Sequence, residues 1–379
     1  MENKMSKVLI AGYYGMGNLG DEIILSELVR RIRLEFENAR AGGCDIKVLT
    51  GDPAVTSSPP DVSAVRRKSP AVVIAALSWC DILIIGGGGI FQDKTSSLSL
   101  YYYFGLILAA KLLGKKVSLC AVGVDRLKKF NTWLARRILV LADSVSVRDD
   151  ESKCFMDSFR GDALRVADFV AALPDDFAAP LLKSAATASG AKRITLVPRR
   201  FQKSDVQFWA RLADACARRF GARVKILPFH KIEDFKYATR IAGAMTMPCE
   251  VVVWESIAGA AAEIASSDVV ISARLHGIIL AASMGIPVCG ISADRKSDLF
   301  LREIGQKNIY ERIDDLDNSG EETIMAVVAD TIRWSDDFKS KIAESSRRLR
   351  RLVEPAAAAA LSPVWNFAAG TSDNYGASR

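Results

Sequence analysis

Short apolar runs rich in β-branched residues alternate with helical patterns along almost the whole chain. Ten of these runs are predicted strands, five in each half, and a stretch of helical periodicity separates most neighbours. Strands that alternate with helices form parallel sheets covered by helices on both faces. We therefore predict an α/β protein with two doubly wound, Rossmann-like sheets in series. The runs are KVLIAG, IKVLTG, DILIIGG, KVSLCAVG and SVSVRD, then RITLVPR, RVKILPFH, EVVVW, DVVISA and IPVCGIS.

The length of 379 residues favours two domains over one. The segment LPDDFAAPLLKSAATASGAKR is rich in Ala, Pro and Ser and separates the two patterned halves. We predict an N-terminal domain over residues 1–175, a C-terminal domain over residues 176–355, and a C-terminal segment over residues 356–379 with a loose tail. Two such domains facing a cleft are typical of a glycosyltransferase-B-like fold.

A formal net charge of +7 favours an anionic partner: a nucleic acid, an anionic membrane surface or a small anionic substrate. Because the motifs of the common RNA-binding modules are absent, we expect no nucleic-acid partner. The seven Cys are scattered without a C-x-x-C pair, which argues against a zinc ribbon and a disulfide framework. The chain begins almost directly in a strand, without the apolar segment of a signal peptide. We expect a soluble cytoplasmic protein.

A glycine-rich motif, GYYGMGNLGDEIIL, follows the first strand. Gly15, Gly17 and Gly20 match the dinucleotide fingerprint, but the acidic helix start and the missing ribose acid about 20 residues on argue against a dinucleotide. Two interpretations stay open. The motif is a turn whose acidic residue caps the helix, or it lines a cleft in which Asn18 and Asp21 reach a sugar hydroxyl.

Two further motifs follow strands of the first half. In IIGGGGIFQD, the four glycines, which include Gly88 and Gly89, either hold an anion or a sugar on backbone N–H groups, or allow a neighbouring helix to approach. In SVSVRDDES, Arg148 either forms a salt bridge with Asp149 or Asp150, or contributes a cation to the site.

Cationic side chains also follow strands of the second half, where parallel sheets bind ligands. Two adjacent guanidiniums suit a carboxylate or phosphate, and a helix N-terminus favours an anion. The arrangement predicts a cleft for a small, highly charged anion, and no acidic cluster indicates a metal site. The candidates are Arg199 and Arg200 in LVPRRF, His230 in LPFHKIEDF, Arg274 and His276 in SARLHG, and Arg295 and Lys296 in SADRKSD.

These motifs together resemble the polysaccharide pyruvyl transferase family of the CsaB type, in the family's order over roughly residues 7–310. The RLHG turn followed by DRK is the most specific part. The resemblance implies a glycosyltransferase-B-like fold and a phosphoenolpyruvate donor without a cofactor. It implies transfer of a pyruvyl ketal to a sugar, typically N-acetylmannosamine in a lipid-linked cell-wall precursor at the inner membrane face. Products of this kind anchor surface-layer proteins.

The resemblance also implies roles for particular residues. The family's donor-site cations fall on Arg148, Arg274, His276 and Lys296, while the family's second-domain Arg corresponds to either Arg199 or Arg200. His276 is the candidate acid that protonates the enol carbon. Asp21 is the candidate base for the attacking hydroxyl. Acceptor contacts are expected from Gly15, Asn18, Asp21, Gly88, Gly89 and His230.

Two rival functions remain open: a nucleotide-sugar-dependent glycosyltransferase of the same fold, and a non-enzymatic binding protein for a sugar or anion. The segment RLKKFNTWLARR leaves a second question open. Its Phe130, Trp133 and Leu134 lie either in the core of a packed helix or on the apolar face of a helix at a membrane interface.

Overall fold

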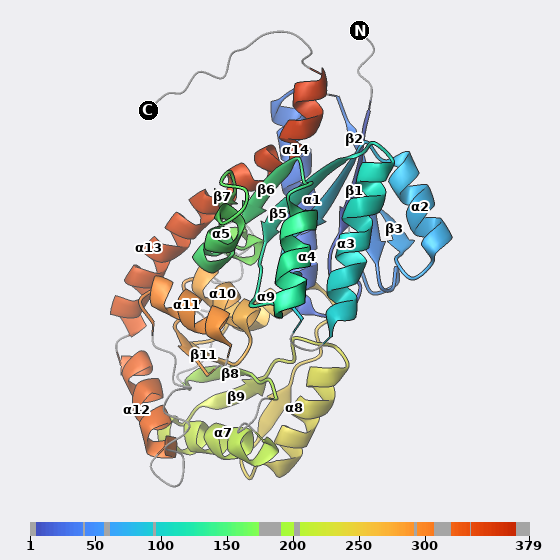
Figure 1. Cartoon of the computed structure of the whole chain (residues 1–379). Coiled ribbons are helices and arrows are strands. Elements are labelled where there is room, and N and C mark those ends of the chain that lie inside the picture. Colours follow the sequence, from blue (N-terminus) through green and yellow to red (C-terminus); the bar gives the residue numbers. More distant parts are fainter. Residues whose placement is uncertain are drawn as a thin grey trace. The chain divides into compact units, whose positions relative to one another are not determined.

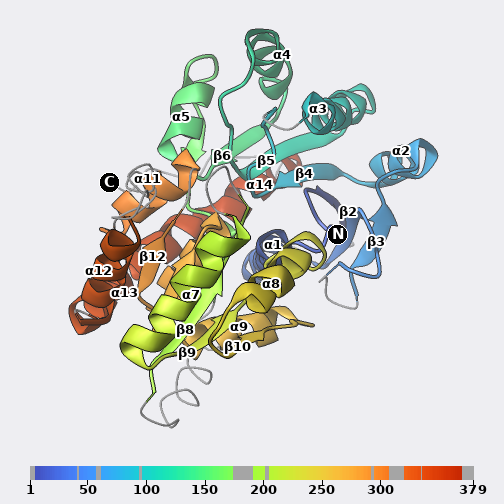
Figure 2. The same cartoon turned by 90° about the horizontal axis from the view of Figure 1, so that it is seen from below.

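The structure is a computed structural model that describes residues 5–40, 42–56, 61–93, 96–173, 191–200, 205–291, 294–306, 320–333 and 335–368. The chain divides into two compact units, each with a parallel sheet of its own. Figures 1 and 2 show the elements of both units. The first unit comprises Met1–Met16, Ile24–Phe169 and Leu352–Arg379, and the second comprises Gly17–Ile23 and Val170–Arg351.

The sheet of the first unit has seven parallel strands in the order β3-β2-β1-β4-β5-β6-β7. Strand β1 pairs with β2 on one side and β4 on the other, so that Ile10 lies between Val48 and Ile84. The strand order reverses between β1 and β4, which makes their carboxyl ends the switch point of this sheet. The strands are β1 (Ser6–Ala11), β2 (Cys44–Thr50), β3 (Ser63–Arg66), β4 (Ile82–Gly86), β5 (Lys116–Val122), β6 (Ser144–Val147) and β7 (Leu164–Arg165).

Helices cover both faces of this sheet. Figure 2 shows α2, α3, α4 and α5 along one face, and α1 with α14 on the other. Leu83 and Ile85 of the fully buried strand β4 share a core with Phe104 and Ile107 of α3. Burial on both faces explains why β4 is an uninterrupted apolar run instead of an alternating one. The helices are α1 (Leu19–Asn38), α2 (Pro70–Trp79), α3 (Ser97–Leu112), α4 (Lys129–Leu139), α5 (Asp150–Asp157) and α14 (Pro355–Ala368).

Helix α14 returns to the first unit from the far end of the chain and packs against β5 and β6. Pro363 lies inside this helix and has no N–H to donate to the carbonyl four residues earlier, that of Ala359. The hydroxyl of Ser144 in β6 donates to that carbonyl at 2.7 Å, and Ser118 in β5 donates to the carbonyl of Ala360 at 2.6 Å. The strand hydroxyls therefore satisfy helix carbonyls where the proline interrupts the ladder.

The sheet of the second unit has five parallel strands in the order β10-β9-β8-β11-β12. Its order reverses between β8 and β11, which are neighbours through Thr195 and Val270. The switch point of this sheet therefore lies at the carboxyl ends of these two strands. The strands are β8 (Arg193–Val197), β9 (Arg223–Ile226), β10 (Cys249–Val251), β11 (Val269–Ser272) and β12 (Val288–Gly290).

The helices of the second unit begin at side-chain caps where the sequence offers Asp or Ser. Asp205 accepts from the backbone N–H of Phe208 at 2.8 Å at the start of α7, which ends at Gly221 in the left-handed region. The helices of this unit are α7 (Val206–Phe220), α8 (Glu233–Ala244), α9 (Ile257–Ala265), α10 (Leu275–Ser283), α11 (Arg295–Glu303), α12 (Gly320–Arg333) and α13 (Ser335–Val353). A short 3₁₀ helix, η1, covers Phe169–Ala172.

All ten predicted strands are confirmed, and the structure adds β3 and β7. The predicted boundary at residues 175/176 lies in the segment 174–190, outside the described residues, as does the tail from residue 369. The predicted C-terminal segment begins one residue after α14 does. Among the described helices, none is long and apolar enough to cross a membrane.

Candidate functional site

The predicted motifs gather at the switch point of each sheet. In the first unit, the loop after β1 carries Gly15, and the turn after β4 carries Gly88 and Gly89. In the second unit, Arg199 follows β8 and Arg274 follows the adjacent strand β11. Open α/β sheets bind ligands at these points, because loops of opposite direction diverge there and leave backbone groups accessible.

The run of glycines at the end of β4 leaves room for a helix at its first two positions, Gly86 and Gly87. A Cβ at Gly86 would lie 2.3 Å from a methyl carbon of Leu28, and one at Gly87 would lie 2.1 Å from a methyl carbon of Ile24. These glycines therefore allow α1 to approach β4, which was one of the two interpretations of this run. Gly88 is buried and accepts a hydrogen bond from Gly123 N–H at 2.8 Å.

Gly15 forms the turn that joins the loop after β1 to the loop after β2. Its φ is +66°, and its carbonyl accepts from the N–H of Asp52 at 3.1 Å. A Cβ at this position would lie 1.8 Å from the hydroxyl oxygen of Thr50. The local geometry thus explains the glycine without a ligand. Its predicted acceptor contact, like those of Gly88 and Gly89, stays a prediction.

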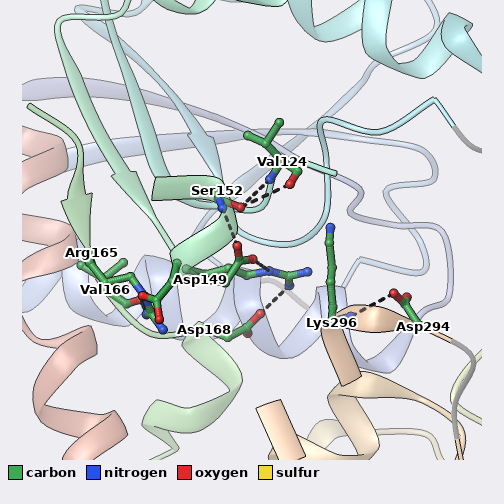
Figure 3. Close-up of polar contacts among 10 residues, drawn as sticks. Val124, Asp149, Ser152, Arg165, Val166, Asp168, Asp294 and Lys296 are labelled. Atoms are coloured by element: carbon green, nitrogen blue, oxygen red, sulfur yellow. Dashed lines mark hydrogen bonds and ion pairs between the residues drawn. The ribbon is translucent and has the colours of Figure 1, made fainter. Parts of the chain in front are cut away.

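Arg148 is held in a buried ion pair. Its Nη1 lies 2.6 Å from Oδ2 of Asp168 and its Nε lies 3.8 Å from Oδ2 of Asp149, while 6% of its side-chain surface is exposed. Asp149 also caps α5 by accepting from the N–H of Ser152 at 2.7 Å (Figure 3). The salt-bridge alternative is therefore confirmed for Asp149, whereas Asp150 pairs with Arg165 at 2.7 Å. The main partner, Asp168, was not predicted.

The segment Gly17–Ile23 belongs to the second unit, although it follows β1 in the chain. It pairs with the loop after β9: Leu19 N–H donates to the carbonyl of Phe229 at 2.8 Å, and Lys231 N–H donates to the carbonyl of Gly17 at 2.9 Å. Asn18 forms an antiparallel bridge with His230, and its Oδ1 accepts from Gly20 N–H at 3.2 Å. Asn18 therefore caps α1.

Gly20 lies directly against the imidazole of His276. A Cβ at Gly20 would be 1.9 Å from Nδ1 of His276 and 2.6 Å from its Cβ. His276 itself occupies the first turn of α10, whose amino end fits against the strands because Gly277 has no side chain to meet Ser272. The third glycine of the glycine-rich motif and the histidine of the RLHG turn are thus in contact within the second unit. Asp21, the next residue, is 8% exposed.

Asp234 organises the cations on the second switch point. It lies in the first turn of α8 and is 4% exposed, and its Oδ1 accepts from Nη2 of Arg274. Its Oδ2 accepts from the N–H of His230 at 2.9 Å. The Nδ1 of His230 in turn accepts from the N–H of Glu233 at 3.2 Å, which caps α8. A carboxylate that was not predicted therefore fixes Arg274, and His230 has a capping role.

Arg199 belongs to the same electrostatic cluster. Burial, and then the positive charge of Arg274, lower the pKa of Arg199 from its usual value, against the opposing effect of Asp294 and Asp234. Arg199 is nonetheless classed as exposed, like Arg200, and arginine stays protonated at neutral pH even with a lowered pKa. Which of the two neighbouring arginines corresponds to the family's residue stays a prediction.

The DRK motif begins α11. Asp294 is its N-cap, and its Oδ1 accepts from the N–H of Lys296 at 3.2 Å (Figure 3). Lys296 is half-buried in the first turn, and Arg295 is exposed. The cap thus orients the helix end that carries the predicted lysine. Among the described residues, no group of three or more His, Cys, Asp or Glu side chains is placed to hold a metal ion.

The second unit therefore brings together, along one sheet edge, two arginines whose charges repel, a lysine, and a histidine at a helix N-terminus. Such an edge stabilises a dianion or trianion, because an anion relieves the arginine repulsion and accepts from forked donors. Sequence reasoning missed Asp234 and Asp168. The sequence gives little indication of either role. Asp234 lies four residues after His230 at a strand end, and Asp168 lies 20 residues after its partner Arg148.

Solved structures share this fold over nearly the whole chain at low sequence identity. The UDP-GlcNAc 2-epimerase of Neisseria meningitidis matches at a TM-score of 0.62 and 12% identity, covering 96% of this chain and 100% of its own. MnaA of S. aureus, solved with UDP, matches at 0.64 and 11%, covering 98% and 99%. A glycosyltransferase of Rickettsia africae matches at 0.57 and 12%, covering 97% and 100%. These similarities establish a glycosyltransferase-B-like α/β fold.

A search of curated proteins found no match. The family model of polysaccharide pyruvyl transferases, however, matches residues 18–295, which is more than half of the chain. The matched range begins at Asn18, which caps α1, and ends just after the N-cap of α11. It therefore contains Gly20, Asp234, Arg274 and His276. This chain belongs to the polysaccharide pyruvyl transferase family and is a transferase.

Proposed function

We propose that the protein transfers a pyruvyl ketal from phosphoenolpyruvate to a sugar and releases phosphate. The observation that carries the proposal is the cluster at the second switch point, where Arg199 follows β8 and Arg274, paired with Asp234, follows the adjacent strand β11. Phosphoenolpyruvate has a carboxylate and a phosphate on adjacent positions of a small skeleton. Both groups suit forked guanidinium donors and the amino ends of helices.

In this proposal, Arg199 and Arg274 bind the donor, and Lys296 with the amino end of α11 neutralises the remaining charge. Asp234 keeps the Arg274 guanidinium in one orientation through its ion pair. Such fixed donors stabilise charge that develops in the transition state without having to reorganise. Arg148, which Asp168 holds in a buried ion pair, stays a proposed donor contact from the first unit.

His276 is proposed as the general acid. It gives a proton to C3 of the enol, which makes C2 electrophilic, and a sugar hydroxyl attacks C2 while its proton passes to a base. The C2–O bond to phosphate then breaks, and a second hydroxyl of the same sugar closes the ketal. Of the two hydroxyl protons, one replaces the proton lost by His276 and the other leaves with phosphate. Gly20 lies directly against the imidazole of His276. Asp21, the next residue, is the proposed base.

The acceptor is proposed from the family resemblance: N-acetylmannosamine in a lipid-linked precursor of a cell-wall polysaccharide, modified at the inner face of the membrane. The product would anchor surface-layer proteins. Asn18 and His230 are the proposed acceptor contacts of the second unit, and Arg200 stays a proposed donor contact. Gly15, Gly88 and Gly89 are proposed for the first unit.

The test uses the full-length protein with phosphoenolpyruvate and a lipid-like N-acetylmannosaminyl-N-acetylglucosamine diphosphate. Acceptor mass and phosphate release are followed together. We expect a pyruvyl mass gain matched by phosphate, and a loss of about 10²- to 10⁴-fold in kcat for His276→Gln, as for removal of a general acid. His276→Gln should still bind phosphoenolpyruvate in calorimetry.

Donor binding is tested separately with Arg199→Gln and Arg274→Gln. Each should weaken phosphoenolpyruvate binding by about 10- to 100-fold, the cost of a lost charge-assisted hydrogen-bond pair. Arg302→Gln is the matched control, because Arg302 is an exposed arginine of α11 that pairs with Asp298 of the same helix at 2.9 Å. Donor binding without turnover would exclude only this acceptor. Absent donor binding, with a nucleotide sugar bound instead, would favour a glycosyltransferase.

A further inference from the structure

Helix α3 carries an apolar stripe on the side that faces away from its sheet. The residues at positions 98, 101, 105, 108 and 112 are all exposed, and they are Leu, Tyr, Gly, Leu and Leu. Leu98 is 77% exposed and Leu112 is 88% exposed. Their spacing of three and four residues places them on one face, which extends for about 21 Å along the helix. A surface helix normally presents polar residues there.

Helix α4 continues this surface. Figures 1 and 2 show α3 and α4 side by side on one face of the first sheet. The hydroxyl of Tyr101 in α3 donates to Oδ1 of Asn131 in α4 at 2.9 Å, and Asn131 Nδ2 donates to Asp93 at 2.6 Å. Phe130 and Trp133, whose ring centroids are 6.0 Å apart, are 63% and 54% exposed. Both aromatic rings of α4 therefore lie outside the core.

Exposed large apolar side chains concentrate on these two helices. Among the described residues there are seventeen, and nine belong to α3, α4 or the turns that directly follow them. Single exposed apolar residues are normal on protein surfaces, but a contiguous group marks an interaction site. The nine are Leu98, Tyr101, Leu108, Leu112, Leu113, Phe130, Trp133, Val140 and Leu141.

The same region holds most of the protein's excess positive charge. Residues 96–143 contain eight Lys or Arg and two Asp, a formal charge of +6 out of +7 for the chain. Asp143 pairs with Lys111 at 2.8 Å and Lys116 at 3.4 Å. Five cations on and before α4 are exposed, and no ion pair is described for any of them: Arg126, Lys128, Lys129, Arg136 and Arg137.

We propose that the apolar face of α3 and α4 docks on an anionic lipid bilayer. Aromatic and leucine side chains beside exposed lysines and arginines match the composition of interfacial helices, which place apolar groups at the acyl boundary and cations among acidic headgroups. A second copy fits less well, because a two-fold interface would bring the five like charges of each copy together. This inference is independent of the proposed reaction.

The test measures sedimentation of the full-length protein with vesicles that contain phosphatidylglycerol, against vesicles of phosphatidylcholine alone. No acceptor or donor is present, so the result does not depend on catalysis. We expect binding to the anionic vesicles that weakens as salt rises. Lys128→Ser with Lys129→Ser should lower the partition coefficient by about 25-fold, and Leu108→Asp with Leu112→Asp by at least about tenfold.

Matched controls come from the second unit. Lys236→Ser with Arg240→Ser removes two exposed cations of α8, and Val253→Asp alters an apolar residue that is 69% exposed. These variants should bind vesicles as the unmodified protein does. Circular dichroism and melting temperature establish that each variant is folded. Trp133→Phe should also abolish most of the fluorescence blue shift on vesicle binding.

Three results would overturn the proposal. One is equal binding to neutral and anionic vesicles with no effect of the cation variant. Another is an absence of vesicle binding by the folded protein. The third is self-association in analytical ultracentrifugation that Leu112→Asp abolishes while vesicle binding is unchanged, which would assign this face to a second copy of the chain.

Discussion

Replacing Gly20 by Ala should displace the imidazole of His276 and lower activity, although His276 itself is unchanged. The new methyl carbon would lie 1.9 Å from Nδ1 of the imidazole and 2.3 Å from Cγ. Since nonbonded atoms sit at about 3.5 Å, the ring must retreat by about 1.6 Å, or α1 must shift by a similar amount. Overpacking of this kind costs about 1–3 kcal/mol of folding free energy. A catalytic group misplaced by about 1 Å loses about 10²-fold in rate.

The assay combines urea unfolding with pyruvyl transfer. Gly20→Ala should lower the unfolding free energy by about 1–3 kcal/mol and kcat by about 10²-fold, with donor affinity nearly unchanged. Gly243→Ala is the control, because this α8 glycine has no neighbouring atom within 4 Å of an added Cβ. It should be neutral or stabilise slightly, as alanine does in a helix.

A double-mutant cycle separates the contact from other effects of alanine. In a His276→Ala background the clashes with Nδ1 and Cγ disappear, although the one with the Cβ at 2.6 Å remains. Gly20→Ala should then cost less, by about 1 kcal/mol of coupling. Strictly additive costs in the two backgrounds, or full activity of Gly20→Ala, would refute the argument that this glycine positions the histidine.

Three further substitutions test the buried carboxylates by urea unfolding. Asp234→Asn should lower the unfolding free energy by about 1–3 kcal/mol, because the Arg274 guanidinium loses its charged partner; an unchanged value would contradict the ion pair. Asp168→Asn should lower the unfolding free energy by about 3–5 kcal/mol, because the buried Arg148 loses its nearest carboxylate and keeps the longer contact with Asp149, and Arg148→Met added to it should recover much of that loss. Burial alone would raise the pKa of Asp214, but hydrogen bonds from the loop at residues 246 and 247 outweigh it and lower the pKa. The ionised Asp214 carboxylate therefore stabilises the folded protein fully above the carboxyl's pKa in the unfolded chain, about 3.9. This stabilisation is lost as the pH falls through the lower pKa of the folded state. The difference between the unmodified protein and Asp214→Asn should shrink below about pH 4, and a constant difference would refute this origin.

The periodicity of the sequence was sufficient for the strands that are buried on both faces. It missed β3, which has only four residues with both ends exposed, and β7, which has two residues at a sheet edge. An edge strand lacks the unbroken apolar run that identifies a central parallel strand. Pairing geometry, which a single sequence does not contain, defines these two strands.

The candidate site was predictable in its cations but not in its carboxylates. Arg274 and His276 stand out because they follow a buried strand and begin a helix. Gly20 lies 256 positions before His276 in the chain, so no local pattern reveals their contact. The exposure of Phe130 and Trp133 was equally hidden, since helical spacing shows which residues share a face but not what that face meets.

The packing of α14 has a consequence for how the protein is made. The unit whose first strand leaves the ribosome earliest also needs the last described helix, whose carbonyls accept from Ser118, Cys120 and Ser144 of β5 and β6. During translation, more than 200 residues are synthesised between β6 and α14. The second unit can therefore fold before the first unit is complete. A premature stop codon just before Pro355 would therefore damage the amino-terminal unit and spare the other, and nascent chains stalled there would be targets for chaperones that recognise exposed sheet faces.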